Sequence, residues 1–331
     1  MEHILRENVL VVGGAGYIGG HCAKSLWAQG FTPIVYDNLS TGHREFVKWG
    51  PAVWAELTDV DSLVSVCRRY APVAVIHLAA LAVVSESVTH PVEYWRTNVT
   101  GTLCLLEAMR AAKINNLIFS STCAVYGEPN VELIRETDSL NPVNPYGTTK
   151  LAAERMMDDF RRAYGIKSIR LRYFNAAGAD PDGELGEDRV AETHLIPIAL
   201  DAAMGRRPHM NIHGTDYPTN DGTAIRDYTH VTDLAGAHVE SIKYLTTGGE
   251  TTAVNLGTGQ GSSVLDVIRI VEEIVGNPIV KNYTARRPGD PTRLVADPGK
   301  ASAVLGWRPT LSSLSRIIGD AHKWHRARFR R

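Results

Sequence analysis

The pattern that most constrains this fold is an alternation of short, mostly apolar runs with helical segments across the first half of the 331-residue chain. Runs without regular polar alternation are typical of parallel strands buried on both faces. Strands that alternate with helices of this length predict βαβ units and an α/β fold with a doubly wound parallel sheet. The expected strands are residues 9–12, 33–36, 73–79, 117–120 and 168–173, and the expected helices are residues 17–29, 61–69, 91–112 and 145–164.

The second half of the chain has a different texture. From about residue 176 onward Gly, Pro, Asp and Asn are dense, which indicates a smaller, loop-rich lobe. Loops carried on a rigid scaffold are where binding groups tend to lie. The segments with helical periodicity here are residues 195–204, 231–244 and 264–275.

Charge and cysteine usage exclude several classes of function. The formal net charge of −1 gives no overall field that would attract nucleic acid or an anionic membrane. The four cysteines are scattered without metal-like spacing, which predicts reduced thiols and no metal site. We expect a cytoplasmic protein, since no leader precedes the first strand and no apolar stretch approaches the roughly 18 residues of a membrane span. The basic run at 325–331 is expected to be a frayed, solvated tail.

A glycine-rich turn follows the first expected strand and opens the first expected helix. Gly13, Gly16 and Gly19 have the G-x-x-G-x-x-G spacing, a variant of the dinucleotide-binding fingerprint. Such a turn lets backbone N–H groups approach a pyrophosphate at a helix N-terminus. Asp37 ends the second strand, where a carboxylate accepts hydrogen bonds from adenosine ribose hydroxyls and repels a 2′-phosphate. We therefore predict NAD rather than NADP, with Arg44 as the one nearby residue that argues the other way.

Tyr146 and Lys150 lie four residues apart in a segment that opens with Asn144 and Pro145. An Asn cap followed by Pro at the first helical position predicts that a helix begins here. The spacing of four then places the phenol and the ammonium on one face of that helix. Because a nearby positive charge favours the phenolate, we expect Lys150 to lower the pKa of Tyr146 and make it a usable base near neutrality.

Two hydroxyl residues, Ser121 and Thr122, follow the expected strand 117–120. In a parallel sheet, residues just past the carboxyl end of a strand face the ligand crevice. Either hydroxyl could therefore bond a substrate hydroxyl or orient the phenol of Tyr146.

These features occur in the order found in the extended short-chain dehydrogenase/reductase superfamily. Within that superfamily the chain resembles the UDP-glucose 4-epimerase (UDP-galactose 4-epimerase) family over nearly its full length. The late motifs matter most, because they separate nucleotide-sugar epimerases from other enzymes with the Tyr/Lys pair. The closer resemblance rests on residues 75–80, 86–88, 98–102, 172–175 and 221–228 and on Arg287-Pro288-Gly289-Asp290.

The resemblance implies NAD-dependent epimerisation at C4 of UDP-glucose and UDP-galactose through a 4-keto intermediate. Tyr146 would take the proton from the sugar 4-hydroxyl, Thr122 would bond the C4 oxygen, and Lys150 would bond the nicotinamide ribose. A Rossmann-like NAD-binding domain is expected over residues 1–176 and a smaller UDP-sugar-binding domain over 177–331, where the part near 228–260 could fold back onto the first domain.

The resemblance also implies which residues contact each ligand. Arg226 and Arg287 fit as pyrophosphate clamps, since guanidinium binds phosphate oxygens bidentately, although Arg226 could equally pair with Asp221 or Asp227. The implied NAD contacts are Gly13, Gly16, Tyr17, Ile18, Gly19, Asp37, Asn38, Ser40, Thr41, Gly42, Glu56, Leu57, Leu78, Ala79, Ala80, Asn98, Ser120, Tyr146, Lys150 and Tyr173. The implied UDP-sugar contacts are Thr122, Tyr146, Asn175, His194, Leu195, Asn211, His213, Arg226, Tyr228, Arg287, Asp290 and Leu294.

Several positions depart from the family pattern or bear on rival functions. His194 stands where Asn is frequent, and Ala82 stands where some relatives have a Lys near the cofactor phosphates. Leu294 aligns with a position that gates the sugar pocket: Tyr there excludes N-acetyl groups, small residues admit them, and Leu is intermediate. A UDP-N-acetylhexosamine or a UDP-pentose such as UDP-xylose or UDP-arabinose therefore stays an alternative substrate.

Related dehydratases carry Asp-Glu directly after the Thr, and this chain has Cys123 and Ala124 there, which disfavours dehydration. A non-enzymatic NAD-binding regulator would commonly lose the Tyr/Lys pair, which is present here. The resemblance finally implies a homodimer that pairs helices 91–112 and 145–164 across a twofold axis. The apolar residues expected at that interface are Leu103, Leu106, Met156, Met157 and Phe160.

Overall fold

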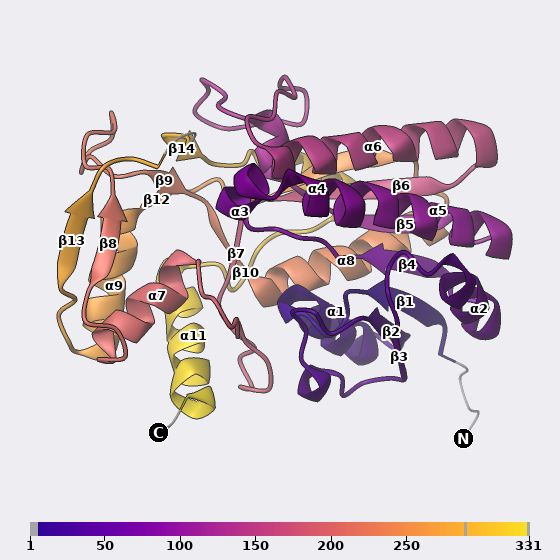
Figure 1. The fold of residues 1–331 in the computed structure, drawn as a ribbon, viewed down its shortest axis with the longest axis horizontal. Coiled ribbons are helices and arrows are strands. Elements are labelled where there is room, and N and C mark those ends of the chain that lie inside the picture. Colours follow the sequence, from indigo (N-terminus) through magenta and orange to yellow (C-terminus); the bar gives the residue numbers. More distant parts are fainter. Residues whose placement is uncertain (1–5, 288–289, 330–331) are drawn as a thin grey trace.

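The computed structural model describes residues 6–287 and 290–329. Figure 1 shows a larger region built around one sheet, beside a smaller region formed mostly by the second half of the chain. The sheet is entirely parallel and includes every strand expected from the sequence, which confirms the doubly wound α/β fold. Across the sheet the strands are β11 (Thr252–Leu256), β6 (Lys167–Tyr173), β5 (Asn116–Thr122), β4 (Ala74–His77), β1 (Asn8–Val12), β2 (Thr32–Asp37) and β3 (Ala52–Trp54).

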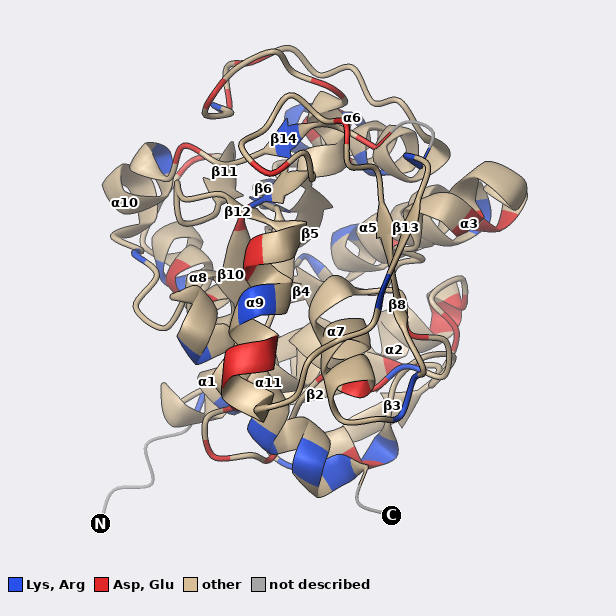
Figure 2. Cartoon of the chain, turned by 90° about the vertical axis from the view of Figure 1, so that its left-hand side faces the viewer, with Lys and Arg blue, Asp and Glu red and all other residues tan. Residues whose placement is uncertain are grey.

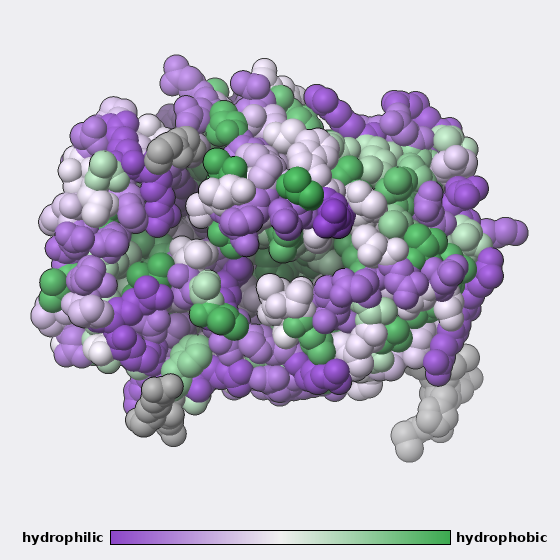
Figure 3. All heavy atoms as spheres, viewed as in Figure 1, coloured by the Kyte–Doolittle hydropathy of each residue, from purple (hydrophilic) through white to green (hydrophobic). Residues whose placement is uncertain are grey.

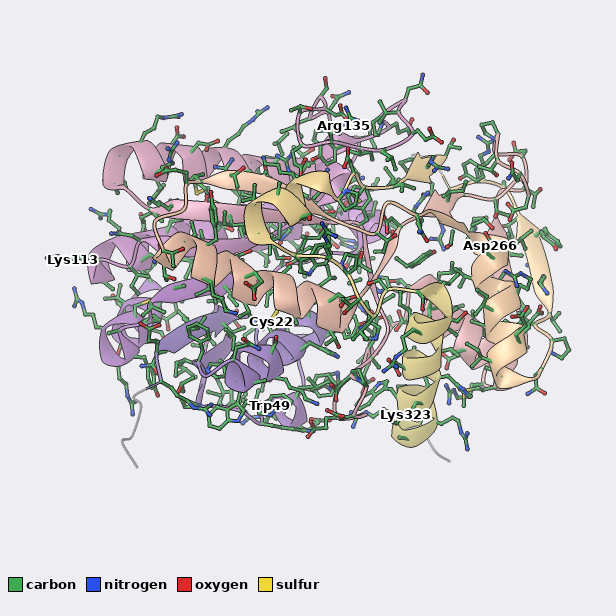
Figure 4. The ribbon with its side chains drawn as sticks, turned by 180° about the vertical axis from the view of Figure 1, so that it is seen from behind. Cys22, Trp49, Lys113, Arg135, Asp266 and Lys323 are labelled. Carbon is green, nitrogen blue, oxygen red and sulfur yellow. The ribbon has the colours of Figure 1, made fainter. Side chains whose placement is uncertain are left out.

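Helices cover both faces of this sheet, so both sets of side chains on its central strands are buried. In β1, Val9 and Val11 belong to one core cluster and Leu10 and Val12 to the other. Cys22, on α1, belongs to the first cluster, and Figure 4 shows it from behind on the side where α1 packs against α8. The first cluster is closed by α1 (Tyr17–Ala28) and α8 (Val231–Thr246), and the second by α2 (Val60–Tyr70), α5 (Gly101–Ala112) and α6 (Pro145–Tyr164).

Two strands of the sheet are not evident from the sequence. β3 has three residues and is half-exposed, and β11 joins the far edge by pairing with β6 from a distant part of the chain. Leu234 of α8 and Val254 of β11 share a core cluster with Val9. The segment from α8 to β11 therefore packs into the layers of the larger region, while the division of the chain into 1–176 and 177–331 stays a prediction.

One expected helix is divided in the structure. Residues 91–112 form α4 (Pro91–Tyr94), a π-helical turn η2 (Trp95–Thr100) and then α5. The wider turn contains Asn98, whose side-chain oxygen accepts a hydrogen bond from the backbone N–H of Leu81 at 2.9 Å. π-helical turns inside α-helices occur often at functional sites. Further short helices of this region are η1 (Arg44–Phe46), α3 (Val84–Thr89) and η3 (Cys123–Tyr126).

The smaller region is built on helices and very short strands. α7 (Leu195–Ala203), α9 (Val264–Val275) and α11 (Leu314–Arg328) share one core cluster, which includes Ile196, Val267 and Ile317. Its strands pair as β8 (Met210–His213) with β13 (Lys281–Thr284), β10 (Tyr228–His230) with β7 (Asn175–Ala177), and β9 (Ile225–Arg226) with both β12 (Ser262–Ser263) and β14 (Arg293–Leu294). The helix α10 (Gly299–Leu305) packs back against β11 and α8.

The expectation of a frayed basic tail is wrong for the described part of residues 325–331. α11 continues to Arg328, and His325 is buried. Arg328 donates hydrogen bonds to Asp188 and Glu45, both at 2.7 Å. The helix is ordered because Ile317, Ala321 and Trp324 recur at helical spacing and are buried, while its basic residues gather around the C-terminal end in Figure 2. Arg330 and Arg331 lie outside the described residues.

Across the parts of the chain that the structure describes, each helix is too short or too polar to cross a membrane.

Candidate active site

The first turn of α6 places Tyr146, as the sequence predicts. The side chain of Asn144 accepts a hydrogen bond from Gly147 N at 2.9 Å, and Pro145 occupies the first helical position. This cap fixes where the helix begins, so Tyr146 and Lys150 lie one turn apart at its N-terminal end. The Tyr/Lys pair thus stands beside the carboxyl ends of the sheet strands.

Lys150 is buried and is held at the end of β5. Its Nζ donates a hydrogen bond to the carbonyl oxygen of Ser120 at 2.8 Å and lies 4.8 Å from the centre of the Phe119 ring. Burial lowers the pKa of Lys150 from 10.5 to about 7, against the charge of Glu154, which raises it. Lys150 is therefore close to losing its proton at neutral pH in the ligand-free protein.

The expectation that Lys150 brings the pKa of Tyr146 toward neutrality is wrong for the ligand-free protein. Burial raises the pKa of Tyr146 to about 12, and a hydrogen bond with Thr122 lowers it only in part. The physical reason is that desolvation of the phenolate outweighs the charges around it. The ammonium of Lys150 is itself weakened by burial and is bonded to Ser120.

The structure distinguishes the two hydroxyls that the sequence left open. Ser121 Oγ donates to the buried carboxylate of Glu154 at 2.5 Å, and Arg172 binds the same carboxylate. Thr122 Oγ1 accepts from Ala124 N at 3.1 Å, which leaves its proton free to be donated. Thr122, rather than Ser121, is thus the hydroxyl available beside Tyr146.

A cavity of about 760 Å³ opens at this point, and the surface is visibly hollowed there in Figure 3. Its lining comes from both regions of the molecule, and every residue implied to hold the UDP-sugar belongs to it. Those residues are Thr122, Tyr146, Asn175, His194, Leu195, Asn211, His213, Arg226, Tyr228, Arg287, Asp290 and Leu294. The tertiary structure therefore brings together side chains that lie up to 172 positions apart in the chain (from Thr122 to Leu294).

The two arginines of this wall differ in their surroundings. Arg226 forms an ion pair with Asp290, rather than with Asp221 or Asp227. The carboxylate of Asp227 instead accepts hydrogen bonds from Thr258, Gly259 and Ala296. Arg287 is exposed at the cavity rim. Of the motif that ends in Asp290, Pro288 and Gly289 lie outside the described residues.

Sequence reasoning missed three charged residues of the cavity wall, Glu187, Arg189 and Arg207. Glu187 is buried, lies 2.6 Å from Nδ1 of His194, and accepts a hydrogen bond from Arg189 Nε at 2.9 Å. The available signal was the run Gly186-Glu187-Asp188-Arg189 ahead of α7, where charged residues interrupt a stretch expected to be a loop.

The glycine turn fits the close approach of a dinucleotide. Gly13 has a φ of +84°, and a Cβ at this position would lie 2.6 Å from Ala79 N. A Cβ on Gly19 would lie 2.1 Å from the carbonyl oxygen of Gly13. The loop is packed so tightly that only glycine is accommodated at both positions, and it opens α1 with backbone N–H groups at the helix N-terminus.

Asp37 lies at the end of β2, next to this loop. Its two carboxylate oxygens accept hydrogen bonds from Ala15 N at 3.0 Å and Leu39 N at 2.7 Å. Arg44 lies over the ring of Trp54, 4.7 Å from its centre. Asp37 therefore both shapes the glycine loop and keeps acceptor capacity for a ribose, since a carboxylate offers about four lone-pair sites.

The other residues implied to contact NAD lie around the carboxyl ends of the strands, but two of them are already hydrogen-bonded. The amide of Asn98 donates to Leu81 O and to Thr149 Oγ1, both at 3.1 Å, so it braces the segment after β4. Tyr173 Oη lies 2.6 Å from Nε2 of His238. The remainder lie at the start of α1 (Tyr17, Ile18), after β2 (Asn38, Ser40, Thr41, Gly42), after β3 (Glu56, Leu57), after β4 (Leu78, Ala79, Ala80) and within β5 (Ser120).

Comparisons with known proteins agree with this geometry. A family model described as GDP-mannose 4,6 dehydratase matches residues 10–318. The UDP-glucose 4-epimerase of Rhizobium leguminosarum bv. trifolii is 50% identical over 319 residues, 96% of this chain and 97% of the relative. That of Rhizobium meliloti (strain 1021) is 49% identical over 322 residues, 97% of this chain and 98% of the relative. A crystal structure of the UDP-glucose 4-epimerase from Brucella ovis in complex with NAD has a TM-score of 0.94 at 52% identity, covering 96% of this chain and 97% of that one.

Proposed function

The chain belongs to the UDP-glucose 4-epimerase family of the extended short-chain dehydrogenases/reductases, and we propose that it interconverts UDP-glucose and UDP-galactose with NAD as its cofactor. The observation that carries this proposal is the cavity itself. Tyr146 and Thr122 stand at one end of it, and its wall contains every residue implied to hold a UDP-sugar. An isomerase that oxidises and then reduces the same carbon needs one acid–base group at that carbon and a site that holds the anionic diphosphate of the substrate firmly.

The residues that would hold NAD are those of the glycine turn, with Asp37 at the ribose and Lys150 at the end of β5. Bound NAD supplies a hydride acceptor for C4 and, in its oxidised form, a positive charge near the phenol. Such a charge favours the phenolate and opposes the burial that holds the pKa of Tyr146 at about 12. We infer that Tyr146 is a competent base only when the oxidised cofactor is bound.

The protein's own groups move one proton in each half of the cycle. Tyr146 takes the proton from the sugar 4-hydroxyl as C4 is oxidised, and Thr122 donates a hydrogen bond to the C4 oxygen and keeps its own proton. The 4-keto sugar then turns within the cavity and presents its other face. Tyr146 returns the proton when C4 is reduced, so that no net redox change results and the cofactor stays bound.

Dehydration is disfavoured at this site even though the matching family model is described as a dehydratase. A dehydratase needs an extra acid and base to expel a hydroxyl. Cys123 and Ala124 line the cavity directly after Thr122, and burial raises the pKa of the Cys123 thiol to about 12. Neither residue transfers protons near neutral pH.

The choice among sugars depends on the wall around Leu294. Leu294 is 9% exposed on β14 and packs with Cys123 and Phe174. A branched apolar side chain at this place limits the room beside the hexose, which favours UDP-glucose and UDP-galactose over N-acetylated sugars. UDP-N-acetylhexosamines and UDP-pentoses are the alternatives to be tested.

Tyr146→Phe tests the proposal. The variant should lose turnover by about 10²–10⁴-fold, the range for removal of a general acid–base group, while binding of UDP-glucose changes little. A coupled assay with a panel of UDP-hexoses, UDP-pentoses and their N-acetylated forms, without added cofactor, measures both turnover and preference. A non-enzymatic NAD-binding regulator would show no turnover in the wild type and no effect of the substitution. Faster turnover of an N-acetylhexosamine or pentose nucleotide than of UDP-galactose would overturn the substrate choice.

We also propose that the protein is a homodimer. Val88, Val92, Trp95 and Leu103 are exposed apolar residues on α3, the divided helix and α5. Of the residues first expected at the interface, Leu106 and Met157 are buried in the protein's own core and are unavailable to a partner. Sedimentation at micromolar concentration should give twice the chain mass, and a monomer would contradict the proposal.

A cytoplasmic location stays a prediction that cell fractionation would test.

A further inference from the structure

Glu187 is a buried acid in the wall of the catalytic cavity that the mechanism above does not use. It lies in the segment that leads into α7, and its side chain is 5% exposed. One carboxylate oxygen accepts from Arg189 Nε at 2.9 Å and lies 2.6 Å from His194 Nδ1. A buried carboxylate between two cationic groups is costly to desolvate unless those partners are charged. The contact therefore favours the protonated form of His194.

The electrostatics of the surrounding elements agree with this geometry. Burial by itself lowers the pKa of His194, and Arg189 lowers it further, but the charge of Glu187 and that of Glu192 raise it above its ordinary value. The pKa of Glu187 is lowered despite its burial, by His194 and then Arg189.

The groups that face this cluster from other elements are largely neutral near neutral pH. Burial raises the pKa of Tyr17 on α1 and lowers that of His325 on α11 to about 4. In the ligand-free protein burial likewise raises the pKa of Tyr146 on α6, while Arg207, after α7, adds a positive charge to the same wall. Of the two acids beside His194, Glu187 has the larger effect, and the pKa of Glu192 is itself raised by burial and by Glu187.

His194 also stands where an anionic ligand can reach it. It caps the N-terminus of α7, its side chain is 43% exposed, and it lines the same cavity as Arg226 and Arg287. Its Nδ1 faces Glu187, which leaves Nε2 for a ligand. An imidazolium at a helix N-terminus can share a diphosphate oxygen with the free backbone N–H groups of the first turn.

We propose that Glu187 is a positioning residue that holds His194 as an imidazolium, so that the entrance of α7 presents a positive charge to the diphosphate of the substrate. This inference rests on the proposed function, because it requires a nucleotide-sugar in the cavity. Glu187 does not touch the substrate. It sets the charge and the direction of the side chain that does.

Calorimetry of the NAD-containing protein tests the proposal. The ligand is an equilibrated mixture of UDP-glucose and UDP-galactose, which gives no heat of reaction and whose diphosphate diester does not titrate near neutrality. Repeating the titration in buffers of different ionisation enthalpy measures the protons taken up on binding. In the wild type, uptake should appear only at pH values above the raised pKa of His194, where the free imidazole has lost its proton.

Glu187→Gln should move that proton uptake to lower pH and weaken binding at neutral pH by about tenfold, the size of one lost hydrogen bond to a charged group. His194→Asn should remove the component of the uptake that Glu187→Gln shifts. Glu184→Gln is the matched control, since Glu184 is an exposed acid three residues earlier that pairs with Lys24, and it should behave like the wild type. Melting temperatures of the variants show whether each one is folded.

The possible outcomes distinguish a failure of this inference from a failure of the proposed function. If Glu187→Gln keeps the wild-type profile of proton uptake, or if His194→Asn retains the component assigned to His194, the role of Glu187 is disproved while the epimerase proposal stands. If the folded wild type binds neither UDP-sugar, the proposed function fails and this inference falls with it.

Discussion

The catalytic pair and the substrate wall reach one cavity by different structural routes. Tyr146 and Lys150 depend on a single capped helix and on the end of β5, both of which belong to the central sheet layers. The substrate wall is assembled from segments that are joined by strands of two to four residues. Rigid elements thus hold the groups that react, while an assembled surface holds the groups that bind. Changes in the first region should therefore act on folding, cofactor and turnover, and changes in the second on affinity.

The largest effect that sharpens this comparison is expected in the glycine turn of the first region. Gly19→Ala would place a Cβ 2.1 Å from the carbonyl oxygen of Gly13. Backbone has to move to relieve that contact, so we expect destabilisation of about 3 kcal/mol or more and purified protein with little NAD. Gly20→Ala is the matched control, because its Cβ would lie 3.3 Å from the flexible side chain of Leu185. Cofactor content and melting temperature measure both variants, and equal NAD retention by the two would contradict the tight fit of the turn.

A smaller effect of a different kind is expected in the second region. Arg226→Ala should raise KM for UDP-galactose about ten- to a hundredfold, as for the loss of one charge-assisted contact to phosphate, and should change kcat much less. Arg269→Ala on α9 is a suitable control, since this exposed arginine pairs with neighbours on its own helix, Asp266 and Glu273. Steady-state kinetics decide the matter. A fall in kcat with KM unchanged would contradict the claim that the second region governs affinity rather than turnover.

The smallest effect, taken per pH unit, concerns the pH dependence of stability in the first region. The pKa of Lys150 is about 7 in the folded, ligand-free protein and 10.5 ordinarily, so the unfolded chain binds more protons at Lys150 between these values. The free energy of unfolding therefore rises with pH across this window, by at most about 1.4 kcal/mol per pH unit for one group. In Lys150→Met the free energy of unfolding should no longer show this contribution to its rise with pH. Urea unfolding of cofactor-free protein at several pH values in the window measures it, and identical slopes for wild type and variant would show that burial does not shift this lysine.

The sequence was most informative about the buried strands and about the helices with strong capping residues. The apolar runs located five strands of the sheet, and α6 and α9 have the predicted bounds of 145–164 and 264–275. α6 was predictable because Asn144 and Pro145 supply a cap and a start, and Gly165 supplies a left-handed end. The π-helical turn at Trp95–Thr100 carries no such local signal, since its hydrogen bonds are decided by the packing of Asn98 against Leu81 and Thr149.

The sequence was least informative where partners come from far along the chain. β11 is half-exposed at its start and acquires its place only by pairing with β6, and the strands of the smaller region are too short to show alternation. Glu187 was missed for a related reason. An acid in a loop resembles a solvated residue until folding buries it beside His194 and Arg189.

Local spacing and capping along the chain encode the parallel sheet, the glycine turn, the register of Tyr146 and Lys150 on one helix, and the motifs of the family. Which charges exist in the cavity is set by folding. Burial brings the pKa of Lys150 down to about 7 and that of Tyr146 up to about 12. Folding also pairs Arg226 with Asp290 and His194 with Glu187. The physical reason is that desolvation and long-range pairing depend on which distant segments surround a group, and no spacing along the chain encodes them.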